Sequence, residues 1–342
     1  MNKQKVLVSG GAGYIGSHTT VELLESGFDV VVVDNLVNSE FSAIENISKI
    51  TGKSFPFIKL DTCDVSELRN VFERYDFDSV IHFAAYKAVG ESVENPLKYY
   101  GNNIQSFVNI LSLMGEFKRT NVIFSSSATV YGDADKLPVT EETPLKPATS
   151  AYGKTKQICE DILEDSVKAY DNLNGIILRY FNPIGAHPSA LIGELPRGIP
   201  NNLVPYITQT AAGIRPCLQI FGNDYDTPDG TCIRDFIDVV DLSKAHICAL
   251  KKLLSYNTAQ NCEIYNVGTG KGVSVQELLN TFENVNNLKL NYTYVGRRSG
   301  DIPEVWADAS KAEKMLGWKA NTPLAETLKN AWAWQRHISA KD

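Results

Sequence analysis

The chain has 342 residues, a hydrophobic content of 43% and a formal net charge of −7, which is typical of a globular protein with two domains or lobes. The acidic balance and the lack of a basic run exclude nucleic acid as the main partner, and no apolar stretch approaches membrane-spanning length. The sequence enters an apolar run almost at once, so we expect no signal peptide, and six scattered cysteines indicate a reducing, cytoplasmic compartment without a disulfide framework or metal site.

The first expected elements form a βαβ unit with a glycine-rich turn. The apolar run Val6–Val8 predicts a buried strand, and it is followed by three glycines spaced three residues apart and then by a helix. A second apolar run, Val30–Val33, ends at Asp34. Backbone amides at such a helix N-terminus can approach a pyrophosphate, and a carboxylate at the end of the second strand can accept from ribose hydroxyls. Because Asp34 would repel a ribose phosphate, we predict NAD rather than NADP.

Strand and helix signals alternate through the rest of the first half. We expect further strands at about 57–60, 79–82, 121–124 and 174–179, with a helix from about 96 to 115 and another from Tyr152 onward. This alternation predicts an α/β fold with a doubly wound parallel sheet, whose ligands bind at the carboxyl ends of the strands. Polar or reactive residues fall at several of these ends: Asp34, Asp61, Lys87, Ser127 and Tyr180. His82 is expected inside its strand as a core residue.

A serine cluster and a Tyr-x-x-x-Lys pair suggest proton transfer. Ser125–Ser127 follow the apolar run that ends at Phe124, and Tyr152 and Lys156 follow a polar loop. Residues four apart share one face of a helix. A tyrosine titrates near pH 10, and a neighbouring ammonium would lower that pKa toward neutral pH, where a phenolate can act as a base. The pair alone is more typical of a solvated helix face, but the serines and the glycine turn favour the catalytic interpretation.

The second half has a different character. Three loop-rich polar segments carry Asn182, Arg234 and Arg298, and arginine matches the geometry of phosphate, so a second diphosphate could bind here. Either arginine alone could equally lie on a solvated surface. We expect a nucleotide-binding domain at 1–180 and a smaller, mixed α/β substrate lobe at 181–342, with some of the later chain free to return to the first domain. The amphipathic tail at 324–334 is expected to pack in a core.

With these residues assembled, the chain resembles the extended short-chain dehydrogenase/reductases, and among them the UDP-glucose (UDP-galactose) 4-epimerases, over nearly its whole length. The most specific segments are 10–18, 87–92, 125–132, 179–183, 185–188, 198–203, 220–225 and 306–311. The resemblance implies a tightly held NAD that is reduced and reoxidised within one turnover. It also implies that Tyr152 takes the proton of the sugar 4-hydroxyl, that Ser127 hydrogen-bonds the reacting oxygen, and that Lys156 holds the nicotinamide ribose and lowers the tyrosine pKa.

The resemblance further implies two sets of binding residues and an assembly. Cofactor contacts are expected at Gly10, Gly13, Tyr14, Ile15, Gly16, Asp34, Asn35, Asn38, Asp61, Thr62, Phe83, Ala84, Lys87, Asn102, Tyr152, Lys156 and Tyr180. UDP-sugar contacts are expected at Ser127, Asn182, Asn202, Leu203, Phe221, Arg234, Arg298, Asp301 and Val305. No metal is implied. Similar proteins commonly form homodimers through helices that correspond here to about 96–115 and 151–170.

Relatives with other chemistry offer alternatives. Sugar-nucleotide dehydratases carry an Asp-Glu pair where this chain has Ala128 and Thr129, and decarboxylases carry Glu at the latter position, so the acid for either reaction is missing. Another NAD-dependent nucleotide-sugar epimerase, or a non-catalytic NAD-binding scaffold, stays open as an alternative. Val305 stands where similar enzymes restricted to plain sugars carry Tyr, so we expect room for N-acetylated sugars as well. Val305 could alternatively be a packing residue only.

Overall fold

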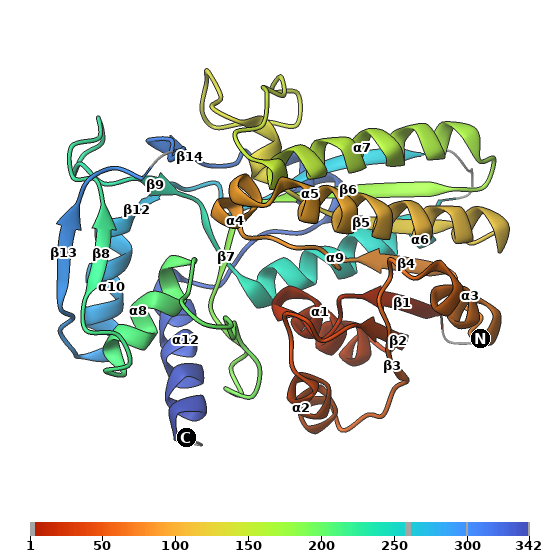
Figure 1. Cartoon of the computed structure of the whole chain (residues 1–342), viewed down its shortest axis with the longest axis horizontal. Helices are drawn as coiled ribbons and strands as arrows, with labels where there is room; N and C mark the ends of the chain where they lie inside the picture. Colours follow the sequence, from red (N-terminus) through yellow and green to blue (C-terminus); the bar gives the residue numbers. More distant parts are fainter. Residues whose placement is uncertain (1–3, 257–260, 299, 341–342) are drawn as a thin grey trace.

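A seven-stranded parallel sheet forms the centre of the molecule (Figure 1). The computed structural model describes residues 4–256, 261–298 and 300–340. Strands in the sheet follow the order β11-β6-β5-β4-β1-β2-β3, which confirms the predicted doubly wound α/β fold. Their bounds are β1 Lys5–Ser9, β2 Asp29–Asp34, β3 Phe57–Lys59, β4 Ser79–His82, β5 Asn121–Ser127, β6 Asn174–Tyr180 and β11 Cys262–Val267.

Helices cover both faces of this sheet. Alternate residues of β1 show why its sequence is continuously apolar: Val6 and Val8 belong to one core cluster and Leu7 belongs to the other. The helices on the first face are α1 Tyr14–Glu25, α2 Phe41–Thr51 and α9 Val239–Leu254, and those on the second are α3 Val65–Arg74, α6 Gln105–Glu116 and α7 Ala151–Ala169. His82 is buried in β4 and packs against Phe107, so its expected place in the core is confirmed.

The helix expected at 96–115 is interrupted. After α4 Val89–Glu94, the chain forms α5 Pro96–Tyr99, a π-helical segment at Tyr100–Ile104, and then α6. A π-helical turn inserts one extra residue into a helix, and such turns are frequent at functional sites. The turn gives Asn103 four hydrogen-bond contacts, to both backbone groups of Tyr86, to Thr155 and to Asn102. These bonds tie the segment after β4 to α7.

The second half builds a smaller lobe beside the carboxyl edge of the sheet, at the left of Figure 1. Ile184, Phe236, Phe282 and Leu328 belong to its core, and the burial of Leu328 confirms that the C-terminal helix packs inward. The helices in and around the lobe are α8 Leu203–Ala211, α10 Val275–Asn286, α11 Ser310–Leu316 and α12 Leu324–Ser339. Its short strands are β7 Asn182–Ile184, β8 Leu218–Phe221, β9 Ile233–Arg234, β10 Phe236–Asp238, β12 Val273–Ser274, β13 Tyr292–Val295 and β14 Glu304–Val305.

Part of the later chain belongs to the first domain. β11 pairs in parallel with β6, from Cys262 opposite Gly175 to Val267 opposite Tyr180, and thereby covers an edge of the sheet. α9 packs on α1 and contacts β5 and β6. Within the described ranges, no helix is long and apolar enough to cross a bilayer.

Candidate active site

The glycine turn between β1 and α1 leaves its backbone open. Gly10 has a φ of +74°, and a Cβ there would lie 2.7 Å from the amide nitrogen of Ala84. A Cβ on Gly16 would lie 2.2 Å from the carbonyl oxygen of Gly10. Only glycine fits these two positions, because the first needs a left-handed backbone and both are in close contact with other backbone. α1 begins immediately after Gly13 with no acidic residue in its first turn, so its N-terminal amides can receive an anion.

Asp34 fixes the end of β2 beside this turn. Its buried carboxylate accepts from the amide of Ala12 at 3.1 Å, from the amide of Leu36 at 2.8 Å and from the hydroxyl of Ser39 at 2.7 Å. A carboxylate has about four lone-pair sites, so capacity remains for a ribose hydroxyl. The neighbouring cofactor candidates are arranged around it: Asn35 donates to Asp61 at 3.1 Å, Thr62 shares a 2.7 Å hydrogen bond with Ser106, and Asn38 is exposed on the same loop.

The structure brings Ser127, Tyr152 and Lys156 together. Ser127 is the last residue of β5 and forms a hydrogen bond with the Tyr152 side chain. α7 begins where the Ser150 hydroxyl accepts from the Gly153 amide at 3.1 Å, which sets the direction in which Tyr152 and Lys156 project. Lys156 Nζ donates to the carbonyl oxygen of Ser125 at 2.6 Å and lies 5.8 Å from the centroid of the Tyr152 ring.

Burial dominates the pKa values of this set. It raises the pKa of Tyr152 to about 12, against the opposing effect of the hydrogen bond from Ser127. It lowers the pKa of Lys156 to about 8, opposed by the charges of Cys159 and Glu160. The sequence-based expectation of a lowered tyrosine pKa is therefore wrong for this structure, because the loss of hydration outweighs the opposing effect of Ser127. At neutral pH Tyr152 is therefore a neutral phenol, whereas Lys156, with a pKa of about 8, is still mostly an ammonium, so the tyrosine needs a further positive charge before it can act as a base.

The other cofactor candidates line the same edge of the sheet. Tyr180 ends β6 and its hydroxyl is hydrogen-bonded to Ser125, the residue whose carbonyl also holds Lys156. Asn102 lies in the π-helical turn and donates to Asn103 at 2.9 Å. The remaining candidates flank the glycine turn: Tyr14 and Ile15 begin α1, and Phe83 and Ala84 follow β4. Sequence reasoning did not single out Ser125, whose role depends on which strands are neighbours.

The substrate candidates gather on the lobe. Arg298 pairs with Asp301 through two contacts of 3.1 and 2.7 Å, and its guanidinium lies 5.6 Å from the centroid of the half-exposed Phe221 ring. β9 pairs with β14, which sets Arg234 opposite Val305. Asn182 is the exposed first residue of β7, and Asn202 and Leu203 begin α8. The arginines and the aromatic ring thus lie in the lobe, whereas Ser127, Tyr152 and Lys156 lie in the first domain.

Val305 lies in an apolar cluster next to the end of β5. It is 8% exposed and belongs to a cluster with Val130, Tyr131 and Phe181, against which Ala128 packs. Ala128 directly follows Ser127. Position 305 thus shares an apolar cluster with residues that follow Ser127, and the short valine there carries no ring or hydroxyl.

Two charged pairs near the site escaped sequence reasoning. Glu160 and Arg179 form a buried pair, with contacts of 2.6 to 3.2 Å, beneath the serine cluster. Glu194 accepts from Lys87 at 2.7 Å and from Asn202 at 2.6 Å. Neither acid stands in a recognisable motif or at a strand end, so only the folded chain reveals its partners.

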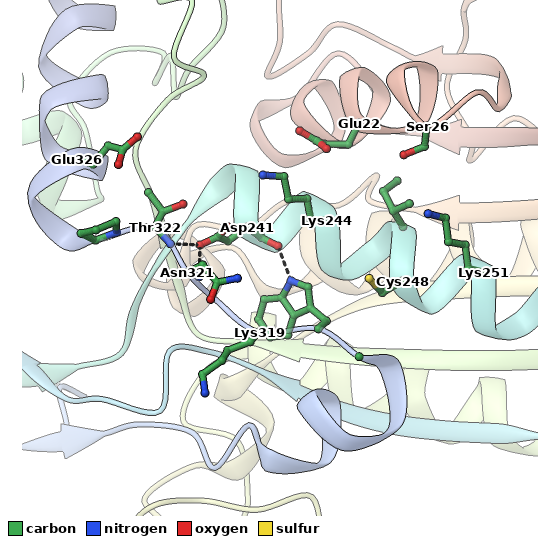
Figure 2. Close-up of a pocket in the computed structure, with 14 residues that line it drawn as sticks. Glu22, Ser26, Asp241, Lys244, Cys248, Lys251, Lys319, Asn321, Thr322 and Glu326 are labelled. Atoms are coloured by element: carbon green, nitrogen blue, oxygen red, sulfur yellow. Dashed lines mark hydrogen bonds between the residues drawn. The ribbon is translucent and has the colours of Figure 1, made fainter.

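A surface hollow of about 470 Å³ lies elsewhere, between α1, α9 and the segment that precedes α12 (Figure 2). Its walls include Glu22, Lys244 and Lys319. Asp241 of α9 accepts hydrogen bonds from the backbone amides of Asn321 and Thr322, at 2.8 and 2.6 Å, and so holds the segment before α12 against α9. None of its lining residues belongs to the predicted catalytic or binding sets. Across the described residues, no group of His, Cys, Asp and Glu has the arrangement of a metal site.

Comparisons with known proteins agree with this geometry. The family model described as GDP-mannose 4,6 dehydratase matches residues 7–331. A UDP-glucose 4-epimerase from Dictyostelium discoideum is 52% identical over 97% of this chain and 95% of its own, and the one from Homo sapiens is 46% identical over 97% of each. A solved UDP-glucose 4-epimerase from Bifidobacterium longum, in complex with NAD+ and UDP, is 45% identical and superposes with a TM-score of 0.94 over 98% of this chain and 99% of its own. The resemblance found in the sequence is therefore confirmed, and the chain belongs to the UDP-glucose 4-epimerase family of the extended short-chain dehydrogenase/reductases.

Proposed function

We propose that this chain is an NAD-dependent UDP-hexose 4-epimerase, which interconverts UDP-glucose and UDP-galactose through a 4-keto intermediate. The observation that carries the proposal is the packing of Ser127, Tyr152 and Lys156 at the end of β5 and the start of α7. The relative from Bifidobacterium longum, crystallised with NAD+ and UDP, supports both ligand classes.

The residues present fit NAD. A pyrophosphate would lie on the α1 N-terminus, where any side chain at Gly10 or Gly16 would collide with backbone, and the adenosine ribose would lie near Asp34. Lys156 and Tyr180 would hold the nicotinamide end, since both contact Ser125. When bound, NAD supplies a positively charged nicotinamide ring that takes up the hydride of the sugar C4 and returns it.

The protein's own residues handle the proton and the sugar. Tyr152 removes the proton from the 4-hydroxyl, and the hydrogen bond from Ser127 favours its phenolate. The positive charge that a bound cofactor brings near Tyr152 counters the burial that raises the tyrosine pKa. After oxidation, the keto sugar turns within the site so that its other face receives the hydride, and Tyr152 returns the proton. Arg234 and Arg298 would bind the diphosphate during that turn, since arginine matches the geometry of phosphate.

Elimination chemistry is disfavoured although the matching family model is described as a dehydratase. Ala128 and Thr129 begin a short 3-10 turn directly after Ser127. Neither carries a carboxyl group that could protonate a departing hydroxyl. A redox-neutral epimerisation needs no such acid. The set Ser127, Tyr152 and Lys156 supplies the proton acceptor and the hydrogen bonds that this reaction requires.

We also propose that N-acetylated sugars are accepted, so that UDP-GlcNAc and UDP-GalNAc are interconverted. The support is Val305, which has neither the ring nor the hydroxyl of a tyrosine and packs beside the segment that carries Ser127. A solved UDP-Glc/GlcNAc 4-epimerase from Campylobacter jejuni is 38% identical to this chain, with a TM-score of 0.84. A pocket that merely has room discriminates weakly between two such sugars.

A homodimer in the cytoplasm is proposed as the working form. Leu97 is 83% exposed and Val93 is 62% exposed at the start of the helical segment that continues into α6, and Ile158 and Ile162 are half-buried on α7. Apolar side chains gathered on neighbouring helices mark an interaction surface.

Leu97→Glu should then convert a dimer to a monomer in analytical ultracentrifugation, whereas a wild-type protein that sediments as a monomer contradicts the assembly. The cysteines within the described chain are unpaired, which suits a reducing compartment.

The decisive experiment is turnover of all four sugars by the purified protein without added NAD. We expect both pairs to interconvert, and we expect denaturation of the protein to release NAD. No conversion of UDP-galactose by protein that carries NAD would contradict the epimerase assignment. Conversion of plain sugars alone would contradict only the claim about N-acetylated sugars.

A further inference from the structure

The segment 185–202, called the strap here, joins β7 to α8 and lies across the first domain. The Tyr14 hydroxyl donates to the carbonyl of Gly185 at 2.8 Å, and the Asn46 amide donates to the carbonyl of Leu191 at 2.8 Å. Arg197 donates to two carbonyls of the loop after β2, at 2.7 and 3.1 Å. The strap is therefore held by the glycine turn, by α2 and by the loop that follows Asp34, which are all predicted parts of the cofactor site or its neighbours.

Glu194 is the strap's link between the two halves of the active site. Lys87 Nζ and Asn202 Nδ2 reach the same carboxylate oxygen, at 2.7 and 2.6 Å, and the Glu194 side chain is only 10% exposed. Its carbonyl accepts from the Trp334 indole at 3.0 Å. The residue before it, Gly193, has no room for a side chain, because a Cβ there would lie 2.5 Å from the Trp334 ring. The carboxylate is thus fixed between Lys87 of the first domain and Asn202 of the lobe.

Each partner keeps donors for a ligand while it contacts Glu194. An ammonium has three N–H donors and a side-chain amide has two, and the contact with Glu194 uses one of each. Contact with Glu194 also decides which way the Asn202 amide faces. The Glu194 carboxylate is close enough to the glycine turn to contribute to the raised pKa of Tyr14, after the larger effect of burial. Without Lys87 to balance it, this charge would repel a neighbouring phosphate.

We propose that Glu194 is a positioning residue that couples the cofactor site to the UDP-sugar site. One oxygen of Glu194 holds both Lys87, a predicted contact of the cofactor, and Asn202, a predicted contact of the UDP-sugar. A ligand that fixes Lys87 therefore also fixes Asn202 through Glu194, and a ligand that fixes Asn202 also fixes Lys87. Coupling between binding sites is reciprocal, so UDP should tighten NAD retention by the same factor by which NAD tightens UDP binding. The inference rests on the proposed function, because that function supplies the two ligands.

The test measures how fast bound NAD exchanges with isotopically labelled NAD, with and without saturating UDP. In the wild type we expect UDP to slow the exchange by about tenfold, within the range of roughly 5- to 150-fold that is usual for coupled sites. Glu194→Gln keeps the shape but loses the charge that holds Lys87. Without UDP, this variant should exchange NAD faster than the wild type does. Saturating UDP should slow the exchange of NAD in the variant by less than about threefold. Lys87→Met, which removes the other end of the link, should weaken the effect of UDP in the same way.

Arg197→Gln is the matched control. Arg197 is exposed and anchors the strap to the loop after β2 without touching Glu194, so this variant should exchange NAD faster while UDP slows it as in the wild type. If UDP slows exchange equally in wild type and Glu194→Gln, or has no effect in wild type that binds both ligands, the coupling role is overturned. A wild type that holds no NAD, or fails to bind UDP in calorimetry, instead contradicts the proposed function.

Discussion

Tyr152 and Lys156 are both deprived of water by the packing of α7 against β5. Burial raises the pKa of the tyrosine to about 12 and lowers that of the lysine to about 8, so at neutral pH the tyrosine is a neutral phenol while the lysine is still mostly an ammonium. A buried phenol at this position is inert at neutral pH until a positive charge is brought near it. The arrangement suits an enzyme in which the tyrosine becomes a base only when the site is filled.

Replacing Tyr152 by Phe removes the proton acceptor and little else. The ring stays packed, so we expect the fold and the bound NAD to persist while the rate of UDP-galactose conversion falls by ~10²–10⁴-fold, as is typical for loss of a general base. Turnover and the NAD released on denaturation are to be measured on the same sample. Near-normal turnover would remove Tyr152 from the mechanism.

A tyrosine at position 305 tests the sugar pocket. Val305 is 8% exposed among apolar side chains that adjoin Ala128. On the proposal above, a tyrosine ring there would take up the room that an acetamido group needs. We expect Val305→Tyr to suppress turnover of the N-acetylated pair by at least tenfold and largely to spare the plain pair, since losing room penalises the bulkier sugar. Equal impairment of both pairs in steady-state assays would instead identify Val305 as a packing residue only.

At the scale of elements, one buried ion pair fastens α7 to the sheet beneath the serine cluster Ser125–Ser127. Glu160 lies one turn after Lys156 and accepts from Arg179 on β6 and from Ser126 on β5 at 2.5 Å. Arg179 also donates to the Tyr131 hydroxyl at 3.2 Å, which in turn donates to Asn266 on β11 at 2.6 Å. This network joins three neighbouring strands to the helix that carries Tyr152.

Breaking this pair should be costly. Glu160→Gln leaves the Arg179 guanidinium buried without its counter-charge, so we expect the free energy of unfolding in urea to fall by about 3–5 kcal/mol. The control is Glu116→Gln, which breaks the exposed pair with Arg69 and should change stability by less than about 1 kcal/mol. Equal effects of the two substitutions would contradict the structural role given to the buried pair.

Local sequence signals predicted the elements that carry a recognisable motif. They missed the element and the residues whose place depends on contacts with remote parts of the chain. The β1–α1–β2 unit followed from the glycines and Asp34, and the serines and Tyr-x-x-x-Lys pattern indicated the catalytic set. β11 was not predicted, because nothing within its short segment indicates that it pairs with β6, which is remote in the sequence. Glu194 and Glu160 lie in ordinary loop and helix sequence, so their importance arises only from residues that are remote in the chain.

Across the whole molecule, three buried histidines make stability depend on acidity. His18 and His246 each contact a backbone carbonyl through Nδ1, and the Nε2 of each is buried without a partner among the described atoms. His82 Nδ1 lies 2.7 Å from the Ser9 hydroxyl. Burial lowers the pKa of His18 and of His82 to about 3 and that of His246 to about 4, and the charge of Lys156 adds to the effect on His82.

These values set the direction and the pH window of acid destabilisation. Below pH 6.5 the unfolded histidines bind protons that the folded ones refuse, so stability falls as pH decreases toward 4. Each histidine should cost about 2 kcal/mol of unfolding free energy between pH 7.5 and pH 5. His18→Gln should therefore reduce the difference between urea unfolding free energies at these two pH values by about 2 kcal/mol, whatever its effect at either pH alone. An unchanged difference would mean that His18 is already charged in the folded protein.

Because β11 is synthesised long after its neighbour β6, the sheet is incomplete during part of translation. β6 is complete at Tyr180, but its neighbour on one side is not synthesised until Cys262–Val267. At ordinary rates of translation the ribosome needs on the order of ten seconds to cover that interval. Throughout it, the nascent nucleotide-binding half presents β6 as an open edge, which is a template for pairing with other chains. A product terminated shortly after Tyr180 would keep that edge permanently, so premature release in this interval favours aggregation over a smaller working domain.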